Sequence, residues 1–408
     1  MTAVPATAQA ALPRKAVVVV ALGITQILAW GSTFYLLGVL APFIARDTGW
    51  SYDFIIGGVS LGLLIAGLVS PLVGRLIGRR GGKPVLAVSA VLLAAGLFGL
   101  GMAPNIATYL AAWIVIGAGM GTGLYDAAFS TAGSIYGSRS RDVITSITLF
   151  GGFASTVCWP LSAFLVDHCG WRGACISYAA VQIAIALPIH LVCLPRTSAA
   201  SAATKHAPIR LEPYEVSIFI ILAAIITMGS AILSMMGTLL LPLLQARGLG
   251  LSAAVGIGMI VGPSQVGARL VEMLAGRRYS PIWTMAASVV LVAVAAAMLL
   301  AGFPLVAITI ALYGAGNGIG SIARGTVPLA LFGPERFPVL MGRLALPLMI
   351  AMAVSPFIGG LAFQYGGASW TLVLLAALAL TNVFFMVALW ALLPERLRRA
   401  PVTERGVT

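Results

Sequence analysis

The sequence predicts an all-α membrane protein of about twelve transmembrane helices, arranged as two pseudo-symmetric bundles of six. Three observations predict this fold. Of the 408 residues, 60% are hydrophobic and only 9% are charged, whereas a soluble domain carries about 25% charged residues. Apolar runs long enough to cross a bilayer, which takes about 20 residues, alternate with short polar breaks. Landmarks of the first half recur in the second half at a nearly constant spacing.

The apolar runs form two sets of six expected spans. Those of the first half are 16–45, 54–77, 84–103, 108–132, 143–166 and 173–194. Those of the second half are 215–243, 253–275, 281–303, 305–331, 339–364 and 368–393. Backbone groups in lipid need internal hydrogen bonds, which favours helices, and the alternation typical of a membrane barrel is missing. The first run leads into further spans, so it is interpreted as a retained helix and not as a signal peptide.

One long polar break, 196–214, is interpreted as a cytoplasmic linker between a bundle at 1–195 and a bundle with a short tail at 215–408. Basic residues concentrate in alternate breaks: Arg14, Lys15, Arg75, Arg79, Arg80, Lys83, Arg139, Arg141, Lys205, Arg210, Arg277, Arg278, Arg336, Arg343, Arg396, Arg398 and Arg399. The other breaks carry only Arg46, Arg172 and Arg247. This bias predicts that both termini and the linker are cytoplasmic. The net charge of +13 forms no single patch with interleaved aromatics, so no nucleic-acid partner is expected.

The two halves share a glycine series, an arginine and a proline in the same order. These landmarks are 117–123 and 314–320, Arg75 and Arg269, and Pro160 and Pro356, at offsets of 197, 194 and 196 residues. Parallel repeats of six spans are a transporter design. The glycine series are expected to let helices pack closely, because neither follows a strand or precedes a Lys-Ser/Thr pair, as a phosphate-binding loop would.

A basic stretch, Gly74-Arg-Leu-Ile-Gly-Arg-Arg-Gly-Gly-Lys83, separates the second and third spans. With it, the chain resembles the major facilitator superfamily over essentially its whole length. The resemblance implies two bundles around a central cavity and a gating role for Gly74, Arg75, Arg79, Arg80 and Lys83. The stretch departs from the family pattern at Gly78, where the family has an acidic residue, and at Gly82, where it has a basic one. The repeat counterpart of Gly78 is Glu272, so an acidic latch is expected only in the second bundle.

Three further stretches, 123–129, 151–160 and 314–326, resemble a bacterial subgroup of that superfamily which includes exporters of arsenite, antimonite and related trivalent arsenicals. The resemblance implies efflux across the bacterial inner membrane. A soft metalloid prefers thiolates, but the four cysteines are expected at depths that do not converge on one site: Cys158, Cys169, Cys175 and Cys193. They are interpreted as packing residues in preference to a Cys169–Cys175 disulfide.

Placing an ionisable side chain inside the bilayer costs free energy, so each such residue within a span is a candidate functional residue. Asp126 lies in the fourth span, and Arg324 lies one position from its repeat counterpart in the tenth. We expect the pseudo-twofold to set the carboxylate opposite the guanidinium, with Asp126 taking up the coupling proton and Arg324 controlling its proton affinity. A nearby cation favours the charged carboxylate, whereas burial disfavours it. The alternative is that Asp126 pairs with Arg75 or Arg79 and only latches the cytoplasmic end.

Gln265, Arg269 and Glu272 share one face of the eighth span. The chain is similar here to monocarboxylate transporters, which place an acidic residue and an arginine four apart; the acidic position is Gln265. This likeness implies that Arg269 binds a carboxylate in bidentate fashion. Separately, Glu272 is a second proton-coupling candidate. The alternatives are an internal Arg269–Glu272 pair, or a pair of Glu272 with Arg324 or Arg343.

Polar groups on two further spans are candidate substrate contacts. They are Tyr313 and Asn317 on the tenth span and Gln26 and Trp30 on the first. The alternative is that buried amides and hydroxyls on the first span only form hydrogen bonds that hold neighbouring helices together. No enzyme activity, cofactor or metal site is expected. The sequence therefore predicts a secondary carrier whose partners are a small solute and the bilayer. Proton-coupled efflux is the first expectation. Uptake or exchange of a small organic anion such as a monocarboxylate is the second, with Arg269 or Arg324 as the substrate-binding residue, and a non-transporting membrane sensor is the third.

Overall fold

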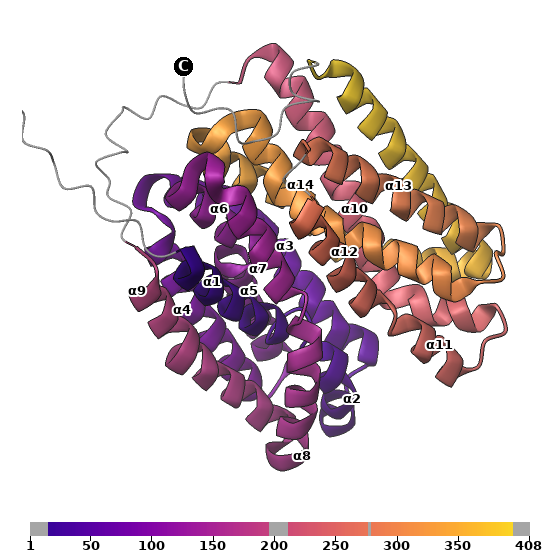
Figure 1. Cartoon of the computed structure of the whole chain (residues 1–408). Coiled ribbons are helices and arrows are strands. Elements are labelled where there is room, and N and C mark those ends of the chain that lie inside the picture. Colours follow the sequence, from indigo (N-terminus) through magenta and orange to yellow (C-terminus); the bar gives the residue numbers. More distant parts are fainter. Residues whose placement is uncertain (1–14, 196–210, 276–278, 395–408) are drawn as a thin grey trace, which may run out of the picture.

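A computed structural model of the chain describes residues 15–195, 211–275 and 279–394, and these residues are helical apart from short turns (Figure 1). The helices of the first half are α1 (Lys15–Gly31), α2 (Leu37–Thr48), α3 (Tyr52–Arg80), α4 (Gly82–Gly101), α5 (Ile106–Gly123), α6 (Tyr125–Tyr136), the 3₁₀ turn η1 (Gly137–Ser140), α7 (Arg141–Gly151), α8 (Ala154–Val181), the π-helical turn η2 (Gln182–Ala186) and α9 (Leu187–Cys193). Those of the second half are α10 (Pro213–Ala246), α11 (Leu251–Gly258), α12 (Val261–Ala275), α13 (Pro281–Leu300) and α14 (Val306–Leu392).

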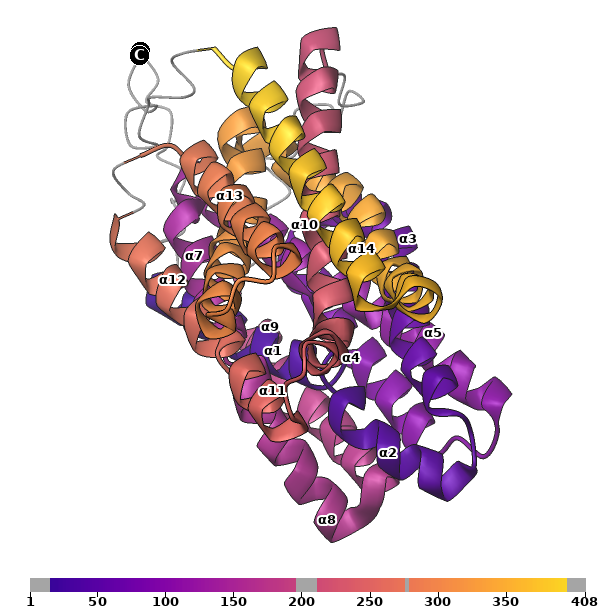
Figure 2. The ribbon, with the colours of Figure 1, turned by 90° about the vertical axis from the view of Figure 1, so that its right-hand side faces the viewer.

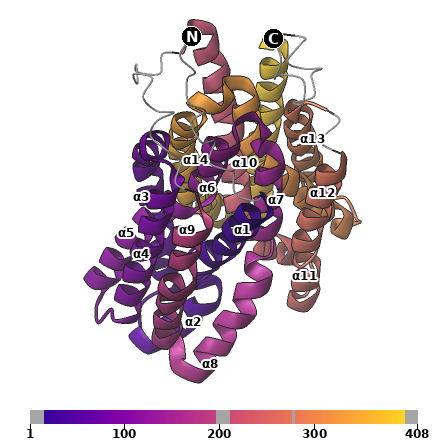
Figure 3. The same cartoon turned by 60° about the vertical axis from the view of Figure 1, so that its left-hand side comes forward.

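The helices of each half lie together, and the two groups lie side by side in Figures 1 and 3. They meet mainly through α3, α6 and α7 of the first half and α12 and α14 of the second; Figure 2 shows α12 beside α7. We call one end of the molecule the linker end. There α10 begins and α14 finishes, joined by a hydrogen bond from the Tyr214 hydroxyl to the Leu392 carbonyl (2.5 Å).

Six of the described helical stretches are long and apolar enough to cross a membrane, judged by length and composition. They are Phe54–Arg80, Gly82–Gly101, Ile106–Cys193, Pro213–Ala246, Pro281–Leu300 and Val306–Leu392, and Lys15–Gly31 is a shorter apolar helix. Two of the six contain 88 and 87 residues, several times what one crossing needs. The all-α membrane fold is confirmed, and the count of twelve spans stays a prediction.

The long stretches reverse direction at glycines with positive φ, a conformation that favours glycine because it has no Cβ. Gly170 (φ 68°) divides α8, while Gly333 (φ 75°) and Gly367 (φ 66°) divide α14 into three segments. Gly367 follows Gly170 by 197 residues, the same offset that relates the two glycine series. The turns therefore repeat along with the helices.

Several expected spans are not continuous helices. The first is interrupted between Gly31 and Leu37, the fourth at Leu124 and the eighth between Gly258 and Val261. The seventh begins two residues earlier than expected, because Pro213 occupies the first helical turn, where its missing N–H costs no hydrogen bond. Most of the predicted linker lies outside the described residues, as do Arg14, Lys205, Arg210, Arg277, Arg278, Arg396, Arg398 and Arg399.

The buried apolar residues form two clusters, of which only the larger joins the two halves. It contains Phe129 and Ile144 of the first half and Phe337 and Leu344 of the second. The smaller contains buried residues of the second half only, such as Met235 and Leu299.

At the linker end, Glu215 in the first turn of α10 pairs with Arg336, and Pro338, two residues further on, lies against Gly74 of the first half. The two halves are therefore in contact at this end, and we describe the conformation as closed there.

Candidate functional site

A break between α5 and α6 sets the position of Asp126. Leu124 is extended (φ −75°, ψ −171°), so α5 ends at Gly123 and α6 begins at Tyr125. Asp126 therefore lies in the first turn of α6, where the helix dipole favours a negative charge. The residue is buried, with 5% of its surface exposed.

Asp126 pairs with Arg324 of α14 across the two halves. The guanidinium engages both carboxylate oxygens, through Nη2 to Oδ2 and through Nε to Oδ1 at 3.2 Å. The two side chains are only 7% and 13% exposed. The structure thus places Arg324 opposite Asp126, as the repeat predicts. The alternative pairing with Arg75 or Arg79 is wrong, because both are exposed and have no ion pair within the described part of the chain.

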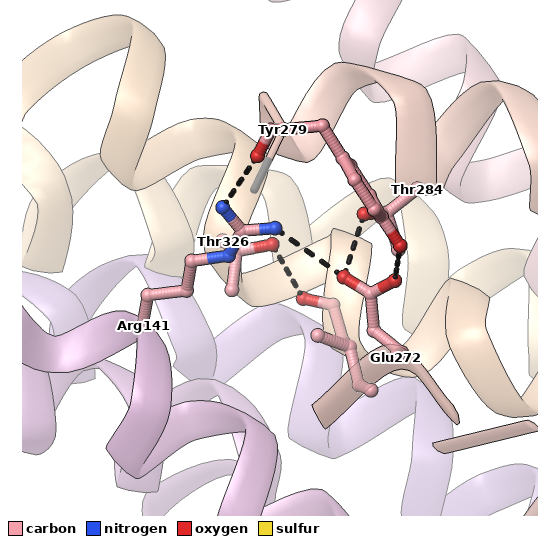
Figure 4. Close-up of polar contacts among 6 residues, drawn as sticks. Arg141, Glu272, Tyr279, Thr284 and Thr326 are labelled. Atoms are coloured by element: carbon pink, nitrogen blue, oxygen red, sulfur yellow. Dashed lines mark hydrogen bonds and ion pairs between the residues drawn. The ribbon is translucent and has the colours of Figure 1, made fainter. Parts of the chain in front are cut away.

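Glu272 of α12 forms the second polar contact between the halves, shown in Figure 4. Its Oε1 accepts from Arg141 Nη2 at 3.3 Å and from Thr284 Oγ1 at 2.8 Å. Its Oε2 accepts from the Tyr279 hydroxyl at 2.5 Å. Arg141, the first residue of α7, also donates through Nη1 to the Tyr279 carbonyl at 2.8 Å. We call these four residues the latch.

Sequence reasoning did not identify Arg141 as the partner of Glu272. The expected partners Arg269, Arg324 and Arg343 form no ion pair with it. A signal was nevertheless present, since Arg141 stands at the start of a span on the side where Glu272 finishes one. Beside the latch lies a recess of about 130 Å³ whose lining includes Lys15 and Thr145, so water-sized molecules reach this contact.

We call the contact surface between the two halves the seam. Arg269 is buried in this seam but has no acidic partner among the described residues. It donates through Nε to the Gly318 carbonyl at 3.1 Å, through Nη1 to the Thr148 carbonyl at 2.9 Å and through Nη2 to Gln265 Oε1 at 3.4 Å. Only 5% of its surface is exposed. No carboxylate among the described residues pairs with it, so the expected internal pair with Glu272 is wrong.

The remaining substrate candidates lie on two helices. Gln26 is fully buried and donates through Nε2 to the Gly123 carbonyl at 2.7 Å. The ring of Trp30, one turn on, lies 5.2 Å from that of Tyr125. Tyr313 is buried in α14. Asn317 is half-buried, and no hydrogen bond of its side chain to another described residue is seen.

Gly74, the first glycine of the basic stretch, lies at a close contact between α3 and α14. A Cβ on Gly74 would lie 2.4 Å from the Pro338 carbonyl oxygen and 3.1 Å from Gly342 Cα of α14. Arg79 and Arg80 are exposed nearby, whereas Lys83 is half-buried. The backbone of α3 thus contacts the backbone of α14 directly, and only glycine fits at this crossing.

We expect Gly74→Val to keep the linker end from closing and to lower the transport rate about tenfold or more, since overpacking a tight contact costs ~1–3 kcal/mol. Gly78→Val is the matched control, because a Cβ there would meet only Val339 Cγ2 at 3.7 Å. Initial rates in proteoliposomes measure the effect. Equal rates for the two variants would contradict this role of Gly74.

The described residues contain no group of three or more His, Cys, Asp or Glu able to hold a metal ion. All four cysteines are free, two of them buried and one exposed. The disulfide considered for Cys169 and Cys175 is therefore not formed.

The family model described as "Major Facilitator Superfamily" matches residues 22–278. An uncharacterized 38 kDa protein of Thermoproteus tenax is 30% identical over 39% of this chain and 41% of its own length. Monocarboxylate transporter 11 of Mus musculus is 32% identical over 34% of this chain and 30% of its own length. The matched region thus spans less than half of either relative.

Two solved structures resemble the chain over nearly its whole length. The human organic anion transporter MFSD10 (TETRAN) has a TM-score of 0.74 at 16% identity, covering 92% of this chain and 100% of the other. The transporter FucP, in the outward conformation, has a TM-score of 0.68 at 14% identity, covering 92% and 99%. At these identities the likeness shows the fold alone.

Proposed function

The chain belongs to the Major Facilitator Superfamily and is a multi-pass secondary transporter, not an enzyme; from this premise we propose that it carries a small organic anion together with a proton. The observation that carries the proposal is Arg269. This guanidinium is buried, yet its three hydrogen bonds all go to uncharged oxygens.

A buried charge without a counter-ion is costly, and a carboxylate substrate would provide one. The bond to the Thr148 carbonyl crosses between the halves, so it breaks when the halves separate at this end. Nη1 then becomes available, and together with the N–H of Nη2 that is not bonded to Gln265 it can bind a carboxylate in bidentate fashion. The partial sequence likeness to a monocarboxylate transporter supports this substrate class.

Asp126 is the proposed proton-binding residue. In the paired state Arg324, and not a proton, balances the charge of its carboxylate. The space beside Asp126, lined by Ser70, Gly74 and Gly342 among others, is too small for a water molecule. In this conformation the carboxylate is paired and shielded. When the halves separate, it loses Arg324 and is free to take up a proton.

The arrangement of the chain in the membrane is part of the proposal. The charge bias supports cytoplasmic termini and a cytoplasmic linker at 196–214, between bundles at 1–195 and 215–408. With that orientation, closure at the linker end makes this an outward-facing conformation. The resemblance to a bacterial subgroup supports the inner membrane.

Efflux of trivalent arsenicals is a second candidate. The three stretches that carry this resemblance supply residues to the seam: Asp126, Gly152 and Arg324. Gly152 gives room to Arg269, because a Cβ there would lie 2.1 Å from Nη1. The proposed substrate in this case is undissociated arsenous acid, which does not need a thiol site. Resistance of expressing cells to arsenite tests this candidate.

Arg269→Gln should lower proton-driven uptake of propionate or lactate by about a hundredfold, because a bidentate bond to a charged group contributes roughly 3 kcal/mol. Proteoliposomes with and without an inward proton gradient measure the rate. Arg343→Gln, an exposed arginine of α14, is the control. Absence of gradient-driven uptake by the wild-type protein for both anions would refute the proposed substrate class.

A further inference from the structure

We propose that the break between α5 and α6, together with Gln26 and Trp30, forms a site for the undissociated carboxyl group of a small weak acid. The inference rests on the proposed function and extends it, since Arg269 recognises the anion and this site recognises its protonated form.

Two buried polar atoms at the break have no partner. Gln26 is 1% exposed, and its Nε2 is fixed by the Gly123 carbonyl, which leaves Oε1 as an unpaired acceptor. Trp30 is 7% exposed, and its Nε1–H is an unpaired donor. A buried polar atom without a hydrogen-bond partner destabilises the folded protein. A ligand that bonds to both atoms offsets this destabilisation.

The two atoms define the chemistry of that ligand. Gln26 and Trp30 are four residues apart on α1, so their side chains are neighbours on one helix face, with Cβ atoms about 5–6 Å apart. One offers an acceptor and the other a donor. In an undissociated carboxyl group, the hydroxyl donates to Gln26 Oε1 and the carbonyl oxygen accepts from Trp30 Nε1. A carboxylate has acceptors only, so it cannot satisfy Gln26.

The second half lacks this arrangement, which argues against a purely structural role. At the repeat offsets of 194 to 197, the counterparts of Gln26 are the apolar residues 220–223, and those of Trp30, at 224–227, include no aromatic residue. The counterpart of Leu124 lies within α14, whose non-helical residues are Gly333 and Gly367. The fold therefore builds the same helix crossing without a break, an amide or an indole.

The site adjoins Arg269 through two consecutive glycines. A Cβ on Gly151 would lie 2.1 Å from the Tyr125 hydroxyl, and one on Gly152 would lie 2.1 Å from Arg269 Nη1. Tyr125 is the first residue after the break and packs against Trp30. Both unpaired atoms are covered in this conformation, and the separation of the halves in the transport cycle gives a solute access to them.

Binding of propionamide to the full-length protein in nanodiscs tests the site, because this amide carries a donor and an acceptor at every pH. Trp30→Phe keeps an aromatic ring but removes the indole donor, so it should weaken propionamide binding roughly three- to tenfold. Methyl propionate, which only accepts hydrogen bonds, should bind more weakly than propionamide to the wild-type protein. Trp113→Phe, a fully buried tryptophan of α5, should bind as the wild type does.

Gln26→Leu serves as a second variant and should weaken propionamide binding to a similar extent, with its melting temperature recorded because it also releases the Gly123 carbonyl. Equal propionamide affinity for the wild-type and Trp30→Phe proteins would overturn the inference. So would equal binding of methyl propionate and propionamide. The proposed function is judged separately, by gradient-driven uptake of propionate in the wild-type protein.

Discussion

Asp126→Asn should abolish proton-driven accumulation of substrate while leaving exchange of substrate for substrate largely intact. The substitution keeps the shape of the side chain but removes its capacity to bind and release a proton. An amide also cannot balance the charge of Arg324, to which both carboxylate oxygens are now bonded. The measurement is uptake into proteoliposomes against a concentration gradient, compared with counterflow at equal pH on both sides.

Loss of accumulation must be separated from loss of folding. Removing one member of a buried ion pair costs ~3–5 kcal/mol when the partner stays charged, so the double variant Asp126→Asn/Arg324→Gln relieves the stranded charge. Asp47→Asn, at an exposed carboxylate paired with Arg172, is a matched control. Normal accumulation by a well-folded Asp126→Asn protein would show that this carboxylate is only a structural tie.

Arg141→Gln should shift the protein away from the conformation closed at the linker end, by roughly tenfold or more in the ratio of the two states. The substitution leaves Glu272 buried with only the hydroxyls of Tyr279 and Thr284 as donors. That loss falls on the closed state alone, because the two residues belong to different halves. Every 1.4 kcal/mol changes such a ratio tenfold.

Spin labels at Arg80 and Leu274, both exposed at the linker end, report this shift as a longer distance between the halves. Cys169 and Cys193 are first replaced by serine to prevent labelling there. The exchanged variant Arg141→Glu/Glu272→Arg should restore part of the closed population, since the pair is re-formed with its charges reversed. Arg139→Gln, two residues before Arg141, is the control. An unchanged distance distribution in Arg141→Gln would rule out the latch as a determinant of closure.

The Arg141–Glu272 pair of the latch and the Asp126–Arg324 pair both join the two halves, but the half that supplies the acid differs between them. The first half supplies an acid to one pair and a base to the other, and so does the second half. Opening the linker end therefore strands one charge of each sign in each half. The close contact between Gly74 and Gly342 adds to these pairs. It lies near Gly78, the position in the first half whose repeat counterpart is Glu272. Closure thus combines two ion pairs with a close backbone contact.

Composition and the internal repeat were sufficient to predict the all-α membrane fold, because a chain with so few charges cannot form a water-compatible surface. The repeat also predicted that Arg324 opposes Asp126, since pseudo-symmetry relates their positions. Both inferences depend on patterns that extend over whole helices. Such patterns are visible in the sequence because each span must itself be long and apolar enough to cross the bilayer.

Only the tertiary structure decided which partners the other charges take. Arg141 and Glu272 are 131 residues apart, and no local spacing relates them. Arg269 bonds to backbone carbonyls, which every residue possesses and which leave no mark in a sequence. The break at Leu124 contains no proline and follows a glycine series, and the Gln26 amide donates to the Gly123 carbonyl beside it. Helix periodicity comes from the chain itself, whereas these contacts exist only where two helices meet.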